Sequence, residues 1–162
     1  PIFHKIIMNN KSGLLSIIIL LFSLGTYGQQ TTIPVKTPFK PPVVKTYIGI
    51  RSGNDTVHLE EATQLVKLPL VVKDEKGSVY KLVNYRLLYK KKGYVENLQT
   101  GKPELHYTTV ASRFDDSPLP KVWSDNIQLT LKSGEELFFF EILVSDANGR
   151  KFYAPDIKLI IR

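Results

Sequence analysis

Three short motifs in this sequence carry the residue types of serine acyl-transfer chemistry, in which a lysine activates a serine nucleophile. They are SVYK at residues 78–81, SDN at 124–126 and KSG at 132–134. In enzymes with these motifs the serine opens a helix. Here Ser78 directly follows a turn-forming stretch, and residues 132–134 are themselves typical of a turn. The sequence therefore offers no geometry for a nucleophile and its base, and we interpret the match as accidental.

Two acidic segments suggest other chemistry. Asp115 and Asp116 form a carboxylate pair of the kind used in acid–base catalysis, but they precede a proline-rich loop that favours a solvated turn. Residues 146–149 (DANG) begin like a calcium loop, although the third acidic position and the closing glutamate are missing. We predict a hairpin turn there and assign no catalytic residue anywhere.

Metal and cofactor sites are not predicted. Beyond the N-terminal region the only histidines are His58 and His106, which lie in separate segments, and the chain has no cysteine. We interpret both as ordinary surface or half-buried histidines. The expectation is no metal ligand, no cofactor and no cofactor-binding residue.

The charge of the chain is basic but dispersed. The formal net charge is +7, and it falls to about +5 when Lys5 and Lys11 are removed. The lysines are not accompanied by clustered arginines and stacking aromatics, so we expect no nucleic-acid partner. Residues 90–92 are three consecutive lysines that could contact an acidic partner or lipid headgroups, and a solvated strand end is the simpler interpretation.

The N-terminal region has the pattern of a secretory signal peptide. Met8 precedes a polar basic start, an apolar run at 14–24 and small residues up to Gly28. We predict an upstream extension at 1–7 and a signal peptide at 8–28. The apolar run is shorter than the roughly 20 residues that span a bilayer, so we expect no stable membrane span after cleavage, with a retained anchor as the alternative. The absence of cysteine excludes disulfides and a lipidated cysteine, which favours a periplasmic or secreted product.

A proline-rich linker is predicted at residues 29–46, because Pro34, Pro38, Pro41 and Pro42 favour an extended, semi-rigid chain. The remaining residues, 47–162, are enough for one domain with its own core. Turn signals in this range recur at the spacing of an all-β protein. We predict an immunoglobulin-like antiparallel β-sandwich.

The predicted centre of the domain is the apolar strand at 137–144, which turns at 146–149 and pairs with a strand at 152–161. An apolar strand at 129–131 is expected before it. Earlier elements are a helical turn at 60–65, a strand at 68–72 that Pro69 marks as an edge or bulge, and a turn at 74–77. A long strand at 79–89 is expected to end at residues 90–93. A weakly patterned stretch at 94–107 contains a turn at 99–102 and precedes a short strand at 108–110, and Val122 and Trp123 are expected to anchor a long loop.

Three motifs in this domain point to a known family. They are VYKLVNY at 79–85, LKSG at 131–134 followed by the strand at 137–142, and DANG at 146–149 followed by the terminal strand at 157–161. With these motifs, residues 47–162 resemble the C-terminal domain of GldM, the periplasmic shaft protein of Bacteroidota gliding motility and type IX secretion. The resemblance implies a β-sandwich that packs against envelope proteins. Because that family has a membrane helix and several preceding domains, this chain is expected to be a free-standing relative.

The function expected from these features is a non-catalytic protein-binding or scaffolding module of the bacterial cell envelope, linked to gliding motility or type IX secretion. Its partners would be envelope proteins, and a homo-oligomer is left open. The alternative is a secreted module that binds sugar or peptide on exposed tyrosine and tryptophan side chains. No binding residue is assigned from the sequence.

Overall fold

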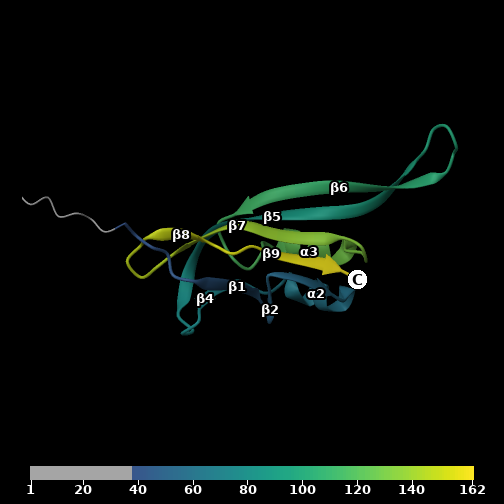
Figure 1. The fold of residues 1–162 in the computed structure, drawn as a ribbon. Helices are drawn as coiled ribbons and strands as arrows, with labels where there is room; N and C mark the ends of the chain where they lie inside the picture. Colours follow the sequence, from purple (N-terminus) through teal and green to yellow (C-terminus); the bar gives the residue numbers. More distant parts are fainter. Residues whose placement is uncertain (1–37) are drawn as a thin grey trace, which may run out of the picture. The chain divides into compact units, whose positions relative to one another are not determined.

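The computed structural model describes residues 38–162, and Lys40–Arg162 form one compact unit (Figure 1). The predicted extension at 1–7, the signal peptide at 8–28 and the linker residues 29–37 lie outside the described residues. None of the helices in the described part is long and apolar enough to cross a membrane.

The unit consists mostly of β-strands, which form one mixed sheet. The strands are β1 (Val44–Ile48), β2 (Arg51–Ser52), β3 (Asn54–Val57), β4 (Leu70–Asp74), β5 (Val79–Glu96), β6 (Pro103–Phe114), β7 (Glu136–Ser145), β8 (Lys151–Ala154) and β9 (Ile157–Ile161). The helices are α2 (Leu59–Leu65) and α3 (Lys121–Thr130). β1 begins at Val44, so the end of the predicted linker range belongs to the sheet.

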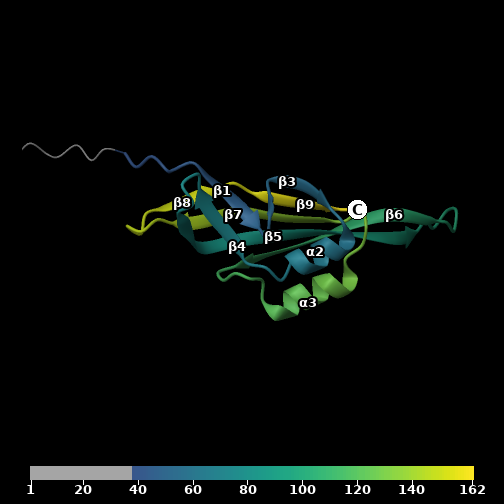
Figure 2. The ribbon, with the colours of Figure 1, turned by 90° about the horizontal axis from the view of Figure 1, so that it is seen from below.

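The strand order is β2-β1-β4-β5-β7-β9-β3, with β6 paired to β5 and β8 paired to β7. All pairs are antiparallel except β3–β9, which is parallel. The sheet is curled, because two parts that are distant in the strand order lie in contact. The Thr46 hydroxyl on β1 donates to the Pro155 carbonyl between β8 and β9, 2.6 Å away, although β4, β5 and β7 lie between β1 and β9 in the order. Figure 2 shows β1 beside β8. The all-β class is confirmed, whereas the immunoglobulin-like sandwich remains a prediction.

The predicted central strand is confirmed as β7. Its side chains alternate, with Leu137 and Phe139 buried, until Glu141, where φ is 49° and the alternation shifts so that Ile142 and Val144 are buried. On the edge of β7 away from β5, the pairing changes there from β9 to β8. The predicted strand at 152–161 is therefore two strands, β8 and β9, because residues 155 and 156 lie between them.

The turn between β7 and β8 contains Gly149 with φ of 76°, as its sequence predicts. We expect Gly149→Val to lower the free energy of unfolding by about 1–3 kcal/mol, because a β-branched residue is strained there. A Cβ at this position would meet no atom within 4 Å, so the effect is backbone strain and not a clash. Gly149→Asn should cost much less, since asparagine tolerates positive φ. Denaturant unfolding of both variants measures this, and an unchanged midpoint for the valine variant would contradict it.

The apolar strand predicted at 129–131 is wrong. Leu129 and Thr130 end the helix α3, and Leu131 is its C-terminal cap. Trp123 and Ile127 lie four residues apart and so share one helix face, with Ile127 only 1% exposed. Trp123 packs on the core as predicted, but Val122 is exposed and anchors nothing.

The predicted end of β5 at residues 90–93 is also wrong, because β5 continues to Glu96. The stretch at 94–107 is strand and turn, and β6 has 12 residues where a short strand at 108–110 was expected. The pairing of β5 with β7 ends at Lys90, so from Lys91 onward β5 has only β6 beside it. We call residues 91–108 the arm; it projects beyond the other strands (Figure 1).

The N-terminal elements follow the sequence more closely. The helical turn predicted at 60–65 is the helix α2, and the turn at 74–77 joins β4 to β5. β4 lies between β1 and β5, so its prediction as an edge or bulged strand is wrong. Pro69 comes directly before β4, where its missing N–H disturbs no pairing.

Candidate functional site

The three acyl-transfer motifs are not brought together. Ser78 precedes the first residue of β5, whereas a Cβ added at Gly134 would lie 3.4 Å from the Lys92 side chain near the other end of that strand. The intervening stretch of β5 is on the order of 40 Å long at about 3.3 Å per residue. Ser124 lies in α3 and donates to the Lys121 carbonyl of the same helix. Ser78 therefore has no partner from the other two motifs.

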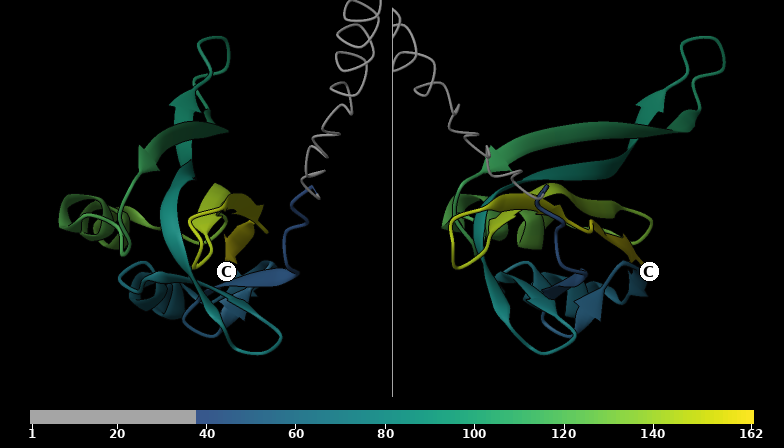
Figure 3. Two further views of the ribbon diagram at one scale, coloured as in Figure 1. Left: turned by 90° about the vertical axis from the view of Figure 1, so that its left-hand side faces the viewer. Right: turned by 60° about the vertical axis from the view of Figure 1, so that its left-hand side comes forward.

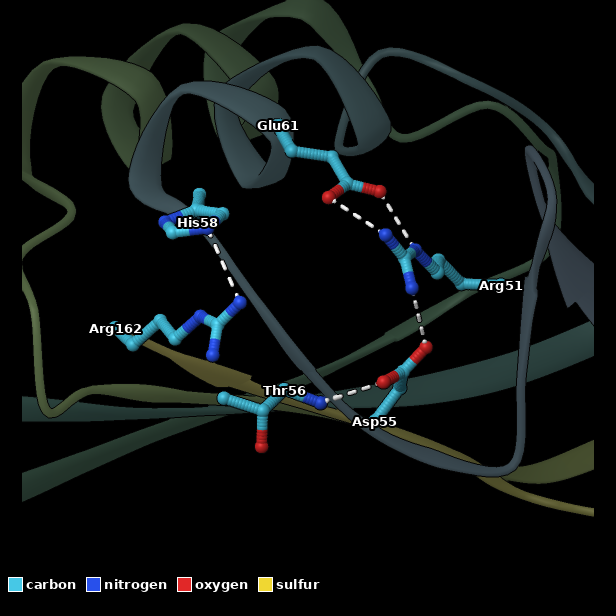
Figure 4. Close-up of polar contacts among 6 residues, drawn as sticks. All are labelled: Arg51, Asp55, Thr56, His58, Glu61 and Arg162. Atoms are coloured by element: carbon cyan, nitrogen blue, oxygen red, sulfur yellow. Dashed lines mark hydrogen bonds and ion pairs between the residues drawn. The ribbon is translucent and has the colours of Figure 1, made fainter.

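The two histidines are also apart. His58 precedes α2, and its Nε2 is 3.1 Å from Arg162 Nη2 (Figure 4). His106 lies on the arm opposite Gly93. Within residues 38–162, no group of three or more potential ligand side chains could hold a metal ion.

The polar cluster in Figure 4 links neighbouring elements of the fold. The Arg51 guanidinium donates to both carboxylate oxygens of Glu61, at 2.6 and 2.9 Å, and to Asp55 at 2.9 Å. This hydrogen bond from Arg51 lowers the pKa of Asp55. The cluster joins β2, β3 and α2. Both carboxylates form ion pairs with the same Arg51 guanidinium, so the interactions of the cluster tie these three elements together.

The acidic segments have ordinary surroundings. Asp115 forms an ion pair with Arg113 and its side chain is 76% exposed, as expected of a solvated loop. Asp146 accepts the backbone N–H groups of Asn148 and Arg150 through one carboxylate oxygen and pairs with the Arg150 side chain through the other. Residues 146–149 therefore form the predicted hairpin turn.

Asp74 stabilises the β4–β5 turn, which predicts a pH effect. Its carboxylate accepts the N–H groups of Lys76 and Ser78, both at 2.9 Å, and the Tyr80 hydroxyl at 3.1 Å. These hydrogen bonds lower the pKa of Asp74 below its usual 3.8, and the bond from the Ser78 N–H has the largest effect. A carboxyl group whose pKa is lower in the folded than in the unfolded state stabilises the fold at pH values above its unfolded-state pKa. This stabilisation is lost as the pH falls through its folded-state pKa.

We therefore expect the stability of the wild-type protein to fall more steeply below pH about 4 than that of Asp74→Asn, which cannot be protonated in this range. The difference in the free energy of unfolding between the two proteins should be constant above pH about 5 and shrink below it. Urea unfolding between these pH values and pH about 2.5 measures the effect. Parallel pH profiles would show that Asp74 does not contribute in this way.

The arm presents apolar side chains to solvent on both faces, because only two strands form it. These side chains are Tyr94, Val95, Leu98, Leu105 and Tyr107. Leu98 at the tip is 97% exposed. Tyr94 and Leu105 lie opposite each other in the register, and neighbouring exposed apolar side chains of this kind are typical of interaction sites.

The three lysines at the base of the arm have different surroundings. Lys90 forms a 3.0 Å ion pair with Glu136 and lies 4.6 Å from the centre of the Tyr107 ring. Lys91 points to the opposite face, with its Nζ 5.0 Å from the Tyr89 ring. No carboxylate of the described residues lies within the 4.0 Å of an ion pair to Lys91. This cation is therefore available to an acidic partner.

A groove of about 210 Å³ lies beside the arm, between α3 and the face of β5 and β6 that points to the core. Its lining residues are Tyr89, Lys91, Val110, Val122, Trp123 and Asn126. The Trp123 ring stands at 84° to the Phe114 ring, 5.2 Å away, which holds it in place. Sequence reasoning missed this groove because it missed α3, although the four-residue spacing of Trp123, Ile127 and Leu131 is a helical signal.

No protein-family model matches the sequence, and no curated protein matches it closely enough to count as a relative. The arm, the groove and the predicted compartment are therefore the features that bear on function.

Proposed function

We propose that this chain is a non-catalytic protein-binding or scaffolding module of the bacterial cell envelope, and that the arm is its contact surface. The observation that supports this most directly is the arm itself. It is a two-stranded hairpin, exposed on both faces, with the apolar residue Leu98 almost fully exposed at its tip. Two strands without a third are marginally stable in water, so a partner that covers the arm would stabilise it.

The compartment and the wider role rest on the sequence. The signal peptide pattern at 8–28 and the absence of cysteine favour the periplasm or secretion. The resemblance to the GldM C-terminal domain supports a link to gliding motility or type IX secretion. Under this proposal the curled sheet is a distant variant of the immunoglobulin-like sandwich of that family.

A secreted sugar- or peptide-binding module is the second candidate, and the groove beside Trp123 favours it. In that case the ligand would contact the groove, and the tip of the arm would stay free. The two candidates therefore differ in where a bound molecule lies.

Photo-crosslinking in intact cells tests the proposal. A photoreactive amino acid would replace Tyr94 or Leu98 on the arm, and Tyr153 on β8 as a matched control, because Tyr94 and Tyr153 are 67% and 68% exposed. We expect adducts with an envelope protein from the arm positions and none from Tyr153. Because Lys91 and Lys92 make no ion pair with the described residues, the adduct yield should fall as salt screens their attraction to an acidic partner.

Adducts only from Tyr153, or equal adducts from all three positions, would contradict the arm as contact surface. The purified protein should also show no hydrolase turnover with a broad panel of ester, amide and glycoside substrates. Turnover that disappears in Ser78→Ala or Asp116→Ala would replace the binding function with an enzymatic one.

A further inference from the structure

β6 has one edge without a partner strand. Within the described residues it pairs only with β5. The Lys92 N–H donates to Glu135 on the β7 side of β5, 2.8 Å away. Because N–H directions alternate along a strand, the N–H groups of Tyr89 and Lys91 point toward β6.

The register then shows which β6 groups are free. Tyr89 lies opposite Val110, and Lys91 lies opposite Thr108, so Val110 and Thr108 bond to β5. The alternate residues Tyr107, Thr109 and Ala111 turn their N–H and C=O groups to the open edge. This edge is a template for another strand.

The edge lacks the features that usually prevent strand addition. Residues 105–112 (LHYTTVAS) contain no Lys, Arg, Asp, Glu or proline, and their register with β5 has no bulge. Tyr107, Thr108, Thr109 and Val110 all favour extended structure. Pro103 and Arg113 limit the edge at its two ends.

The groove lies where the side chains of an added strand would point. The left panel of Figure 3 shows α3 and the yellow C-terminal strands on opposite sides of β5, so the sheet can extend past β6 on the side of α3. A side chain opposite Val110 on the core-facing side would enter the groove against Val122 and Trp123. The next side chain on that face, opposite Thr108, would lie nearest Lys91.

We propose that an extended segment of a partner protein adds antiparallel to β6, with an apolar side chain in the groove and an acidic side chain two residues later near Lys91. The sequence it requires is apolar-any-acidic within an alternating strand. Main-chain hydrogen bonds would give affinity, and the groove and Lys91 would give specificity. This inference rests on the proposed protein-binding function and names the chemistry of the partner.

The probe is a fluorescein-labelled peptide, Thr-Val-Thr-Leu-Thr-Glu-Thr-Val-Thr, compared with the same peptide carrying Lys in place of Glu. Fluorescence anisotropy with the protein as recovered from cells measures both affinities. We expect the Glu peptide to bind at least tenfold more tightly than the Lys peptide. Lys91→Gln should remove most of this discrimination, because it removes only the cation.

Two proline variants test the edge itself. Thr109→Pro removes an N–H from the open edge beside the groove, and we expect it to weaken binding at least tenfold. Leu105→Pro removes an N–H from the same edge opposite the last residue of the peptide, and should change binding less than twofold because the terminal residue contributes little. Hydrogen exchange followed by NMR should show the amides of Tyr107, Thr109 and Ala111 becoming protected when the Glu peptide binds to the wild-type protein.

No binding of the Glu peptide at about 1 mM, or binding without protection of these three amides, would overturn strand addition to β6. Equal loss of affinity in the two proline variants would overturn the position beside the groove. If these results occur while arm crosslinks to an envelope protein still form, the strand-addition inference fails and the proposed function stands. If the peptide binds but no arm crosslink forms in cells, the proposed contact surface fails instead.

Discussion

Phe139→Ala should lower the free energy of unfolding by about 3–5 kcal/mol. Phe139 is 1% exposed and occupies the centre of β7, opposite Leu87 on β5 and Ile157 on β9. Its ring centre lies 6.1 Å from that of Tyr85. The alanine would leave a cavity that three strands line, and because these strands are hydrogen-bonded to one another they cannot close it.

The neighbouring residue is a matched control. Phe138 points to the other face of β7, where it is half-buried and stacks on Phe140 with ring centres 5.1 Å apart. Phe138→Ala should cost about 1–2 kcal/mol, because less surface is uncovered and no enclosed cavity forms. Guanidinium unfolding of the two variants measures the difference, and equal losses would show that the two faces of β7 are equally buried.

The sequence predicts β7 and its turn correctly because both signals are local. Residues 137–144 form a short run rich in aromatic and branched apolar side chains, and Gly149 favours the positive φ that the turn uses. Both features depend only on residues close in the chain, and the structure confirms them.

The arm was missed because its base has a composition that is unusual for a strand. Lys90, Lys91, Lys92 and Gly93 have low strand propensity, which favoured an end to β5 there. In the structure, side chains alternate between the two faces of β5. Lys90 forms an ion pair with Glu136 and contacts the Tyr107 ring, and Lys91 contacts the Tyr89 ring on the other face. The contacts of Lys90 come from β6 and β7, and sequence pattern does not show them.

Other errors have the same origin. The parallel pairing of β3 with β9 joins residues about a hundred positions apart, and no local pattern encodes it. The helix α3 was hidden because Leu129, Thr130 and Leu131 resemble the start of a strand. The candidate groove needs both α3 and the arm, so a prediction without these two elements misses it, although Lys91 and Trp123 both stand out in the sequence.

The buried carboxylate of Glu135 fixes the point where the arm leaves the sheet. Glu135 is 1% exposed. One of its oxygens accepts the Lys92 N–H at 2.8 Å, and the other accepts the Tyr89 hydroxyl and the Lys132 N–H at 3.0 Å. Burial, and then the bond to Glu135, raise the pKa of Tyr89, which therefore remains a donor over the physiological range. The sequence contains a signal for this burial, because in an extended chain Glu135 shares a face with the buried residues Leu137 and Phe139.

Glu135→Ala is expected to lower the free energy of unfolding by about 3–5 kcal/mol, since three donors lose their acceptor and the Tyr89 hydroxyl is enclosed. Glu136→Ala is the matched control, because Glu136 forms ion pairs with Lys90 and Lys158 at the partly exposed surface and should contribute no more than about 1 kcal/mol. The Lys92 amide should also exchange faster in Glu135→Ala, because its acceptor is gone. Denaturant unfolding with hydrogen exchange measures both effects. Equal stability of the two alanine variants, with an unchanged Lys92 amide, would show that Glu135 does not hold the base of the arm.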